Sequence, residues 1–284
     1  FTFIHAGSSG IGWISLVRAF FLRGFISRLD FFLEGWFVKW KKMRINQFLA
    51  RAGVGSRRKV EEIVLAGRVK VNGSTLTDLS YRVLDKDEVR LDGKRLDIKD
   101  DPDLFRIIAF NKPAGYLASH EDEHNDHMIF ELLPKEYQKY NYAGRLDLDS
   151  RGLMFLSNDG DFIQRITHPS KKIDKEYIVT LNKAIEWKPI ADEFMLGVRE
   201  GGETLRAKFV SPAFPTSKEA LEPTNHLRVV LGEGKKRQIR RMFHSKNLSV
   251  IDLYRVRIGN FSLEKKPIEE GKFIGVREEQ IISK

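Results

Sequence analysis

The chain has 284 residues, long enough for two ordinary domains or one large one, and its 42% of hydrophobic residues can fill a sizeable core, so we do not expect a disordered protein. Its 49 lysines and arginines outnumber 39 aspartates and glutamates and give a formal net charge of +10, so polyanions such as RNA, DNA or an anionic membrane are the expected partners. The absence of cysteine excludes disulfides, thiolate zinc sites, iron–sulfur clusters and cysteine nucleophiles, and it fits a reducing cytoplasm.

The first 42 residues differ in composition from the rest. They are rich in aromatic side chains, do not begin with methionine, and run directly into "MRINQFLARAG", so we expect Met43 to be the natural start. Arg18, Arg23 and Arg28 interrupt the apolar run before it reaches the ~20 residues that a membrane span needs. We therefore expect no membrane insertion, and we interpret residues 1–42 as a translated upstream region or a poorly ordered extension.

Residues 43–96 have the pattern of a small module of two helices and a hairpin. The first predicted helix has apolar side chains at helical spacing and a glycine at its end, namely Ile45, Phe48, Leu49, Ala52 and Gly53. The second has a serine cap, an apolar stripe and a closing glycine, namely Ser56, Val60, Ile63, Val64 and Gly67. The turn pair Asn72-Gly73 then predicts a hairpin, and "DEVRLDGKRL" predicts further short strands.

Three cations, Arg57, Arg58 and Lys59, open the second predicted helix. The helix macrodipole disfavours positive charge there by about 0.3–1 kcal/mol per residue, so stability does not account for them. Basic side chains beside free backbone N–H groups make a phosphate site, which Arg68 and Lys70 on the next strand can extend. The alternative is a solvated charged face. The whole segment resembles the S4 RNA-binding domain in its helix, helix, hairpin order, and that resemblance implies docking on structured RNA.

A second domain is predicted over residues 105–284, after a polar, acidic linker at residues 97–104 that contains Pro102. Its strand-like runs are "FRIIAF", "LMFLS", "KEYIVTL", "LRVVL" and "YRVRIGNFSL". Helix-like segments, "HMIFELLPKEYQKY" at residues 127–140 and "KRQIRRMFHSK" at residues 236–246, lie between them.

The stretch "GRLDLDSRG", residues 144–152, places two carboxylates in a strongly basic protein. Asp147 and Asp149 could serve as the acid and base of a glycoside hydrolase. The spacing argues against this role, because residues two apart diverge along an extended segment and no second carboxylate is forced across a substrate. From the residues alone, a turn or capping role for these aspartates is the alternative.

Metal and nucleotide sites are not indicated. His120, His124 and His127 lie in the acidic loop "SHEDEHNDHM", but they lack helical zinc-motif spacing and are typical of solvated loop residues. There is no Walker loop, dinucleotide fingerprint or Gly-x-Ser-x-Gly elbow. We therefore expect neither a metal nor a nucleotide cofactor.

Two further segments carry candidate functional side chains. In "GEGKKRQIRRMFHSK" cations surround an apolar helical stripe. This segment is either a plain surface helix or a wall that binds phosphates and turns one arginine toward a carboxylate. The cations are Lys235, Lys236, Arg237, Arg240 and Arg241. In "KEYIVTL", Tyr177 alternates with Val179 and Leu181, so on a strand it points toward the core with them. A plain core tyrosine is the alternative to a functional one.

Four motifs in order, "NKPAGY", "GRLDLDSRGLMFLSNDGD", "KEYIVTL" and "RQIRRMF", follow the S4-like module. Together they resemble the bacterial ribosomal-RNA pseudouridine synthases of the RsuA type, which include the RluB, RluE and RluF groups, from about Met43 to near the C-terminus. The resemblance implies that Asp147 is the catalytic aspartate, Tyr177 the active-site tyrosine and Arg240 the cation that pairs with Asp147. It also assigns Arg145 to the flipped nucleotide and a mainly structural role to the "KP" pair of the first motif.

The resemblance further implies an α+β fold, in which the S4-like module precedes a synthase domain with a mixed, largely antiparallel sheet and a central catalytic cleft. The implied reaction isomerises uridine to pseudouridine in ribosomal RNA without any cofactor, in a monomeric cytoplasmic protein. Free RNA and a pre-ribosomal particle both remain open as substrates, and the motifs favour large-subunit over small-subunit RNA. The alternatives are a non-catalytic RNA-binding or ribosome-assembly factor and a hydrolase that uses the two aspartates.

Overall fold

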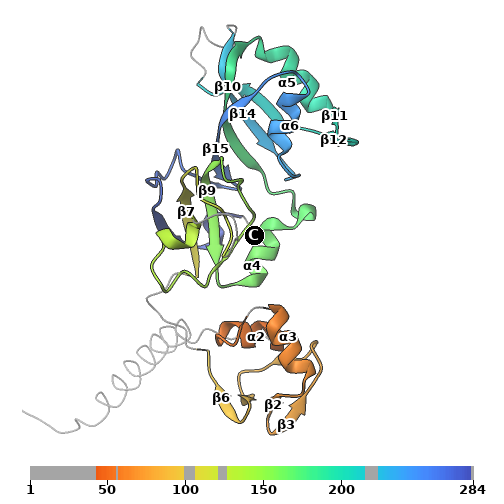
Figure 1. Ribbon diagram of the computed structural model, residues 1–284, viewed down its shortest axis with the longest axis vertical. Helices are drawn as coiled ribbons and strands as arrows, with labels where there is room; N and C mark the ends of the chain where they lie inside the picture. The colour runs from red at the N-terminus through yellow and green to blue at the C-terminus, as the bar shows by residue number, and fades with distance from the viewer. Residues whose placement is uncertain (1–42, 56, 99–105, 121–126, 215–222, 283–284) are drawn as a thin grey trace, which may run out of the picture. The chain divides into compact units, whose positions relative to one another are not determined.

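The computed structural model describes residues 43–55, 57–98, 106–120, 127–214 and 223–282. The chain divides into two compact units, one ending at Lys99 and the other beginning at Asp100 (Figure 1). The predicted leader, most of the predicted linker, Ser56 and His124 lie outside the described residues.

The small unit has the predicted helices and hairpin. Its elements are β1 (Met43–Arg44), α2 (Ile45–Arg51), α3 (Arg57–Leu65), β2 (Val69–Val71), β3 (Ser74–Leu76), β4 (Arg82–Val83), β5 (Val89–Leu91) and β6 (Lys94–Leu96). Four strands form a sheet in the order β3-β2-β5-β6, and β1 pairs with β4. Asn72 and Gly73 both have positive φ, 50° and 85°, which is the backbone conformation of a type I′ hairpin turn.

The core of the small unit lies between the helices and the sheet. From the predicted stripes, Ile45 and Leu49 of α2 and all three residues of α3 are buried there, while Phe48 is partly buried and Ala52 lies just beyond α2. The buried residues, with valines from the strands, are Ile45, Leu49, Val60, Ile63, Val64, Val69, Val71, Val83 and Val89. The helical periodicity of these apolar residues therefore identified the buried faces correctly.

The large unit is built on a mixed sheet. Within the described residues nine strands form it: β7 (Ile107–Lys112), β8 (Asn141–Tyr142), β9 (Arg151–Ser157), β10 (Lys175–Ile185), β13 (Phe209–Pro212), β14 (Thr224–Leu231), β15 (Val250–Ile258), β16 (Phe261–Ser262) and β17 (Phe273–Val276). The main path is β13-β14-β10-β15-β9-β7-β17. Neighbouring strands are antiparallel except for β9 and β15, which are parallel. The predicted α+β class with a mixed, largely antiparallel sheet is confirmed.

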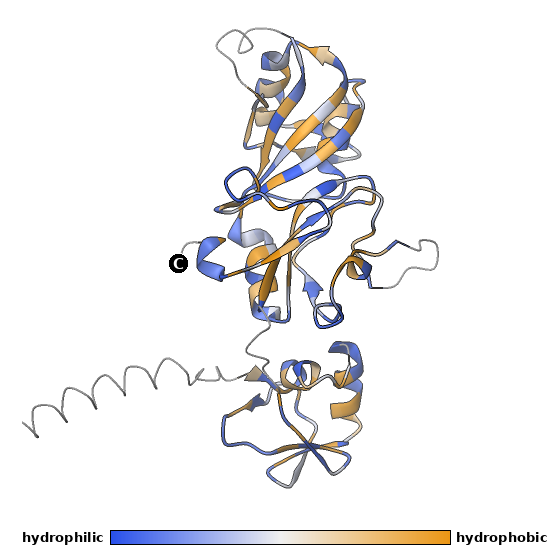
Figure 2. Cartoon of the chain, turned by 90° about the vertical axis from the view of Figure 1, so that its left-hand side faces the viewer, coloured by the Kyte–Doolittle hydropathy of each residue, from blue (hydrophilic) through white to orange (hydrophobic). Residues whose placement is uncertain are grey.

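Helices cover the sheet in two places. Helices α5 (Trp187–Leu196) and α6 (Gln238–His244) lie beside β10 and β14, and α4 (Gly160–Thr167) lies beside β9 (Figure 1). Hydrophobic and hydrophilic residues alternate along the strands near α5 and α6, as expected for a sheet with one face in the core (Figure 2). That core contains Tyr177, Val179, Leu181, Phe194, Ile239, Met242 and Phe243. A short hairpin, β11 (Val198–Glu200) with β12 (Glu203–Leu205), follows α5.

The helix expected over residues 127–140 is wrong. Only a short 3₁₀-helix, Ile129–Leu132, forms there. Leu133 is extended, with φ −107° and ψ 147°, because the residue before a proline is sterically excluded from the helical region and Pro134 follows it. Among the described residues, no helix combines the length and apolar character needed to cross a membrane.

Candidate active site

The loop between β8 and β9 carries Asp147 at the edge of the main core. Leu146 is buried in the same core cluster as Tyr177, which holds the next side chain, Asp147, at the surface with 39% of its area exposed. The loop is a tight turn, because Ser150 N–H donates to the carbonyl of Asp147 at 3.1 Å. The N–H of Gly115, which follows β7, donates to the carbonyl of Leu148 at 2.8 Å. The reactive candidate is therefore set on a backbone that its neighbours hold in place.

Lys112, at the end of β7, holds this loop through hydrogen bonds to its backbone. Its side chain is fully buried, and Nζ donates to the carbonyls of Ser150 at 2.6 Å, Pro113 at 3.0 Å and Leu148 at 3.3 Å. Burial lowers the pKa of Lys112 from 10.5 to about 8; the nearby Asp149 carboxylate opposes this shift, and the charge of Arg255 adds to it. The lysine is thus a buried cation that holds backbone oxygens.

The low pKa of Lys112 predicts a specific dependence of stability on pH. Between about pH 8 and pH 10.5 the unfolded chain keeps a proton that the folded chain has lost, so this residue makes the free energy of unfolding rise with pH. Lys112→Met lacks this titration. Urea unfolding at pH 7, 8, 9 and 10 should show the wild type gaining stability relative to Lys112→Met across that window. A difference between the two proteins that stays constant with pH would contradict the shifted pKa.

Gly152, the last residue of the "GRLDLDSRG" stretch, allows β9 to approach β15 closely. A Cβ on Gly152 would lie 2.3 Å from the carbonyl oxygen of Arg255 and 2.7 Å from its nitrogen. Its φ of 112° is also one that side-chain-bearing residues rarely adopt. Since Gly152 is the parallel-strand partner of Arg255, any larger residue forces these two central strands apart.

Two arginines from the start of α6 meet the aspartates. Arg237, in the left-handed conformation ahead of the helix, lies 3.7 Å from the carboxylates of both Asp147 and Asp149. Arg240 is only 13% exposed; it lies 3.1 Å from the Asp149 carboxylate and donates to the carbonyl of Val250 at 2.7 Å. The expected pairing of Arg240 with Asp147 is therefore wrong in this structure. The bond to Val250 directs the Arg240 guanidinium toward Asp149, and Arg237 takes the place beside Asp147.

Tyr177 lies on β10 with its side chain in the core, 7% exposed, on the same side as Val179 and Leu181. The predicted direction of this side chain is confirmed. Tyr177 stands in register with Arg255 on β15, and β15 is followed in the sheet by β9 and β7. Consecutive places in the sheet thus bring together motifs that are far apart in the sequence.

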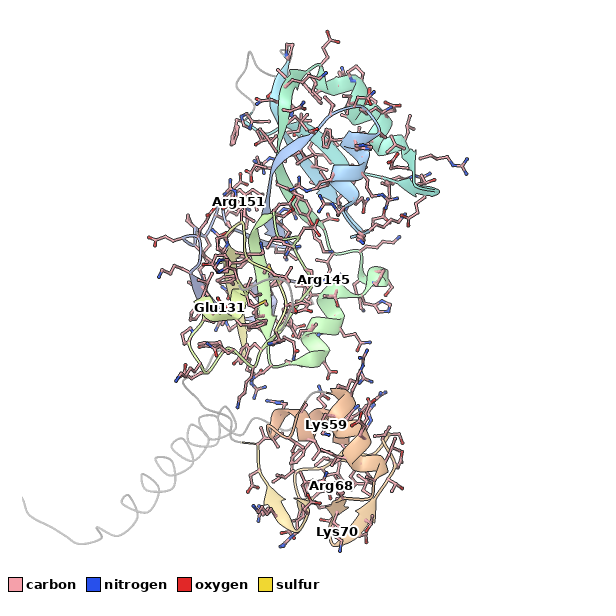
Figure 3. All side chains as sticks on the ribbon, in the orientation of Figure 1. Lys59, Arg68, Lys70, Glu131, Arg145 and Arg151 are labelled. Atoms are coloured by element: carbon pink, nitrogen blue, oxygen red, sulfur yellow. The ribbon has the colours of Figure 1, made fainter. Side chains whose placement is uncertain are left out.

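The other predicted RNA-binding residues of the large unit have different surroundings. Arg145 is exposed in the loop ahead of β9, and Figure 3 labels it together with Arg151 at the start of that strand. Lys236 is exposed beside Arg237. Arg241 instead pairs with Glu203 at 2.6 Å and donates to the carbonyl of Glu200 at 2.6 Å, so it joins α6 to the β11–β12 hairpin.

The basic residues of the small unit are exposed and mostly paired. Arg57 lies 2.9 Å from Glu61, Lys59 lies 3.8 Å from Glu62, and Arg68 lies 2.5 Å from Asp92. Arg58 and Lys70 are exposed, and among the described residues neither makes an ion pair. Figure 3 shows Lys59 at the helical end of this unit and Lys70 at the strand end. Exposed ion pairs contribute about 0–1 kcal/mol to stability, so these cations can leave their carboxylate partners and bind RNA phosphates with little loss of free energy.

The histidine-rich loop shows no metal centre within its described part. His120 stacks on Phe130 with ring centroids 3.8 Å apart, and the ring centroids of His127 and Tyr116 lie 5.5 Å apart. In the described ranges as a whole, no three His, Asp or Glu side chains gather as metal ligands.

Sequence reasoning missed two contributors to the site. Arg237 was assigned only to RNA binding, because its left-handed backbone at the start of α6 is invisible in a helical pattern. Arg255 was not singled out, although "LYRVRIG" alternates like a strand and places an arginine on the same side as the buried Leu253. A charged residue at a core-facing strand position is a signal that could have identified it.

Both units are similar to known proteins. The family model for RNA pseudouridylate synthases matches residues 106–245, and the model for S4 domains matches residues 43–89. The ribosomal large subunit pseudouridine synthase B of Bacillus subtilis is 34% identical over 213 residues, which cover 75% of this chain and 84% of that protein. The Vibrio cholerae protein of the same name is 34% identical over 228 residues, which cover 78% of this chain and 68% of that protein.

A solved structure supports the same grouping. The crystal structure of a pseudouridylate synthase matches with a TM-score of 0.56 and 26% identity, covering 84% of this chain and 98% of that chain. The resemblance inferred from the motifs is confirmed. With its synthase match, its S4 match and relatives that share about a third of its residues over most of its length, the chain belongs to the RNA pseudouridylate synthase family.

Proposed function

We propose that this protein isomerises a uridine of large-subunit ribosomal RNA to pseudouridine and that Asp147 is the catalytic carboxylate. The observation that carries the proposal is the placement of Asp147, a half-exposed carboxylate on a fastened loop, next to Arg237 and on the core cluster that contains Tyr177. The relatives from Bacillus subtilis and Vibrio cholerae, named as large-subunit pseudouridine synthases, support the choice of substrate.

The reaction breaks the N1–C1′ bond of uridine, rotates the uracil and joins C5 to C1′, while C5 loses a proton and N1 gains one. Nothing is consumed, so the chemistry requires only groups that hold the nucleotide and stabilise charge. A carboxylate can attack C1′ covalently or stabilise the positive charge that develops on the sugar, as carboxylates do in glycoside hydrolysis. Asp147 serves in one of these two ways, and Tyr177 stacks on the uracil or takes part in removing the C5 proton.

The two arginines of α6 have separate tasks in this proposal. Arg240 is largely buried and pairs with Asp149, so it holds the part of the loop that follows Asp147. Arg237 has 46% of its side chain exposed and lies between the two carboxylates, where its charge offsets their mutual repulsion. Because of that exposure it can also contact the phosphate of the flipped nucleotide, together with Arg145 and Lys236.

The target base must leave its stack to reach Asp147, which costs a few kcal/mol. Phosphate contacts made by the S4 domain, proposed over residues 43–96, and by the synthase domain, proposed over residues 105–284, offset that cost. We propose that the protein acts in this way as a monomer in the cytoplasm on ribosomal RNA, either free or in an assembling particle.

The basic start of α3 should supply part of the RNA affinity. Replacing Arg57, Arg58 and Lys59 together with alanine should weaken RNA binding and lower the slope of log affinity against log salt by about 2, because up to three phosphate contacts are lost. Filter binding of ribosomal RNA by the full chain between 50 and 300 mM salt measures the slope. The control keeps every charge by using Arg57→Lys, Arg58→Lys and Lys59→Arg. An unchanged slope in the alanine variant would remove this module from phosphate binding.

The proposed function is tested by mapping pseudouridines in ribosomal RNA from cells with and without the gene, using carbodiimide modification and primer extension. Loss of one large-subunit site, restored by the wild-type gene but not by Asp147→Asn, is the expected result. Loss of a small-subunit site would overturn the substrate assignment, and unchanged ribosomal RNA would overturn the proposed function.

A further inference from the structure

Arg255 is a buried arginine directly behind the candidate site. It lies on β15 and is 2% exposed. Its Nε donates to the carbonyl of Leu153 at 2.7 Å, and its Nη1 lies 3.4 Å from the carbonyl of Arg145. Among the described residues no carboxylate pairs with Arg255, and its third nitrogen, Nη2, is buried without a hydrogen-bond partner. Within the described ranges, the contacts of its guanidinium are thus to backbone oxygens.

These two carbonyls bracket the segment that carries Asp147. Arg145 precedes the aspartate by two residues, and Leu153 follows the loop on β9. Lys112 holds the middle of the same segment through the carbonyls of Leu148 and Ser150. Two buried cations from β7 and β15 thus hold the backbone on both sides of Asp147. The close approach of Gly152 to the backbone of Arg255 fixes the distance between β9 and β15.

Fold stability does not explain this arginine. An unsatisfied buried donor costs about 1–3 kcal/mol, and an apolar side chain of similar volume often replaces a buried charge without loss. Arg228 on β14 shows how the same sheet stabilises a partly buried arginine: its side chain is 20% exposed and pairs with both Glu176 and Glu264. In the described part of the chain Arg255 has no such carboxylate partners, so we assign its contacts to the loop.

We propose that Arg255 is a positioning residue that sets the place of the Asp147 carboxylate relative to the ribose of the flipped uridine. This inference rests on the proposed function, because it assigns a geometric task to a residue that acts through Asp147. A displacement of about 1 Å in a reacting group can cost 10²-fold in rate. Removal of Arg255 should therefore lower kcat by about 30- to 100-fold while KM for RNA changes by less than about threefold.

The experiment compares Arg255→Met with Arg228→Met in the full chain, using pseudouridine formation on a large-subunit RNA fragment, RNA affinity and thermal unfolding. Arg255→Met should bind RNA like the wild type and lose kcat. Arg228→Met should show the reverse pattern. Its unfolding temperature should be lower, but its kcat, measured at a temperature at which the variant is folded, should equal that of the wild type. A kcat of Arg255→Met within threefold of wild type, or a loss confined to KM, would overturn the inference.

If Arg255→Met does not fold, Arg255→Lys takes its place in the same experiment. The lysine retains the buried charge but cannot span the carbonyls of Arg145 and Leu153 as the guanidinium does, so kcat should fall at least tenfold with the unfolding temperature nearly unchanged. A wild-type kcat in Arg255→Lys would sink the inference. If the wild-type protein itself forms no pseudouridine on ribosomal RNA, the proposed function fails first and the positioning role fails with it.

Discussion

Asp147→Asn is expected to lower pseudouridine formation by about 10³-fold or more while the affinity for ribosomal RNA stays within about twofold of wild type. Asparagine keeps the shape of the side chain, but it cannot attack C1′ as a carboxylate or carry the negative charge that stabilises a positive ribose. The loop should keep its position, because Lys112 and Gly115 hold it through backbone carbonyls. Single-turnover assays with excess enzyme and a filter-binding titration measure the two quantities.

Asp149→Asn provides the matched control for Asp147→Asn. Asp149 lies two residues away and contacts the same Arg237, and it also pairs with Arg240. Its replacement should reduce the rate by roughly tenfold or less, since Asp149 is itself 50% exposed and its loss weakens two ion pairs without removing the reactive group. If Asp149→Asn abolished turnover and Asp147→Asn retained it, the roles of the two aspartates would be reversed.

Gly152→Ala is expected to have the largest effect on stability among single substitutions at the site. The new Cβ would lie 2.3 Å from a backbone oxygen of β15, at a φ of 112° that alanine rarely adopts. Backbone atoms in the centre of a sheet cannot move aside as a flexible side chain can, so the two strands must separate. We expect a loss of about 3 kcal/mol or more in the free energy of unfolding of the large unit, measured by urea denaturation.

Gly160→Ala is the matched control for that substitution. Gly160 begins α4, and a Cβ there meets no atom of the described residues within 4 Å. Alanine in this position should be neutral or stabilise the protein by up to about 1 kcal/mol, because it reduces the freedom of the unfolded chain. A Gly152→Ala protein as stable as Gly160→Ala would show that β9 and β15 do not pack as closely as described.

The elements that sequence reasoning predicted correctly are those whose signals are local. The apolar spacing of α2 and α3, the Asn72-Gly73 turn and the alternation that turns Tyr177 toward the core each depend on a few neighbouring residues. The stripe of α6 is local as well. The helix predicted over residues 127–140 was wrong, because the prediction used the apolar run and neglected the steric effect of Pro134 on Leu133.

The details of the site could not be predicted, because they depend on contacts between distant segments. Whether Arg237 or Arg240 faces Asp147 is decided by the left-handed backbone of Arg237 and by the carbonyl of Val250. The role proposed for Arg255 depends on the parallel pairing of β15 with β9. Local patterns of apolar and polar residues do not show which distant strands pair, so only the family resemblance connected these motifs before the structure did.

Several contacts that hold the Asp147 loop, from Lys112, Arg255 and Gly115, end on main-chain oxygens of the segment. A side chain of the loop that takes no part in the ion pairs with Arg237 and Arg240 is therefore free to change without moving the aspartate. Leu148, between the two carboxylates, is 41% exposed although its carbonyl is held from two sides. During divergence such a position can be altered to suit a different RNA neighbour while the reaction itself is preserved. An enzyme built in this way can acquire a new target uridine by substitutions on its surface, without rebuilding its chemistry.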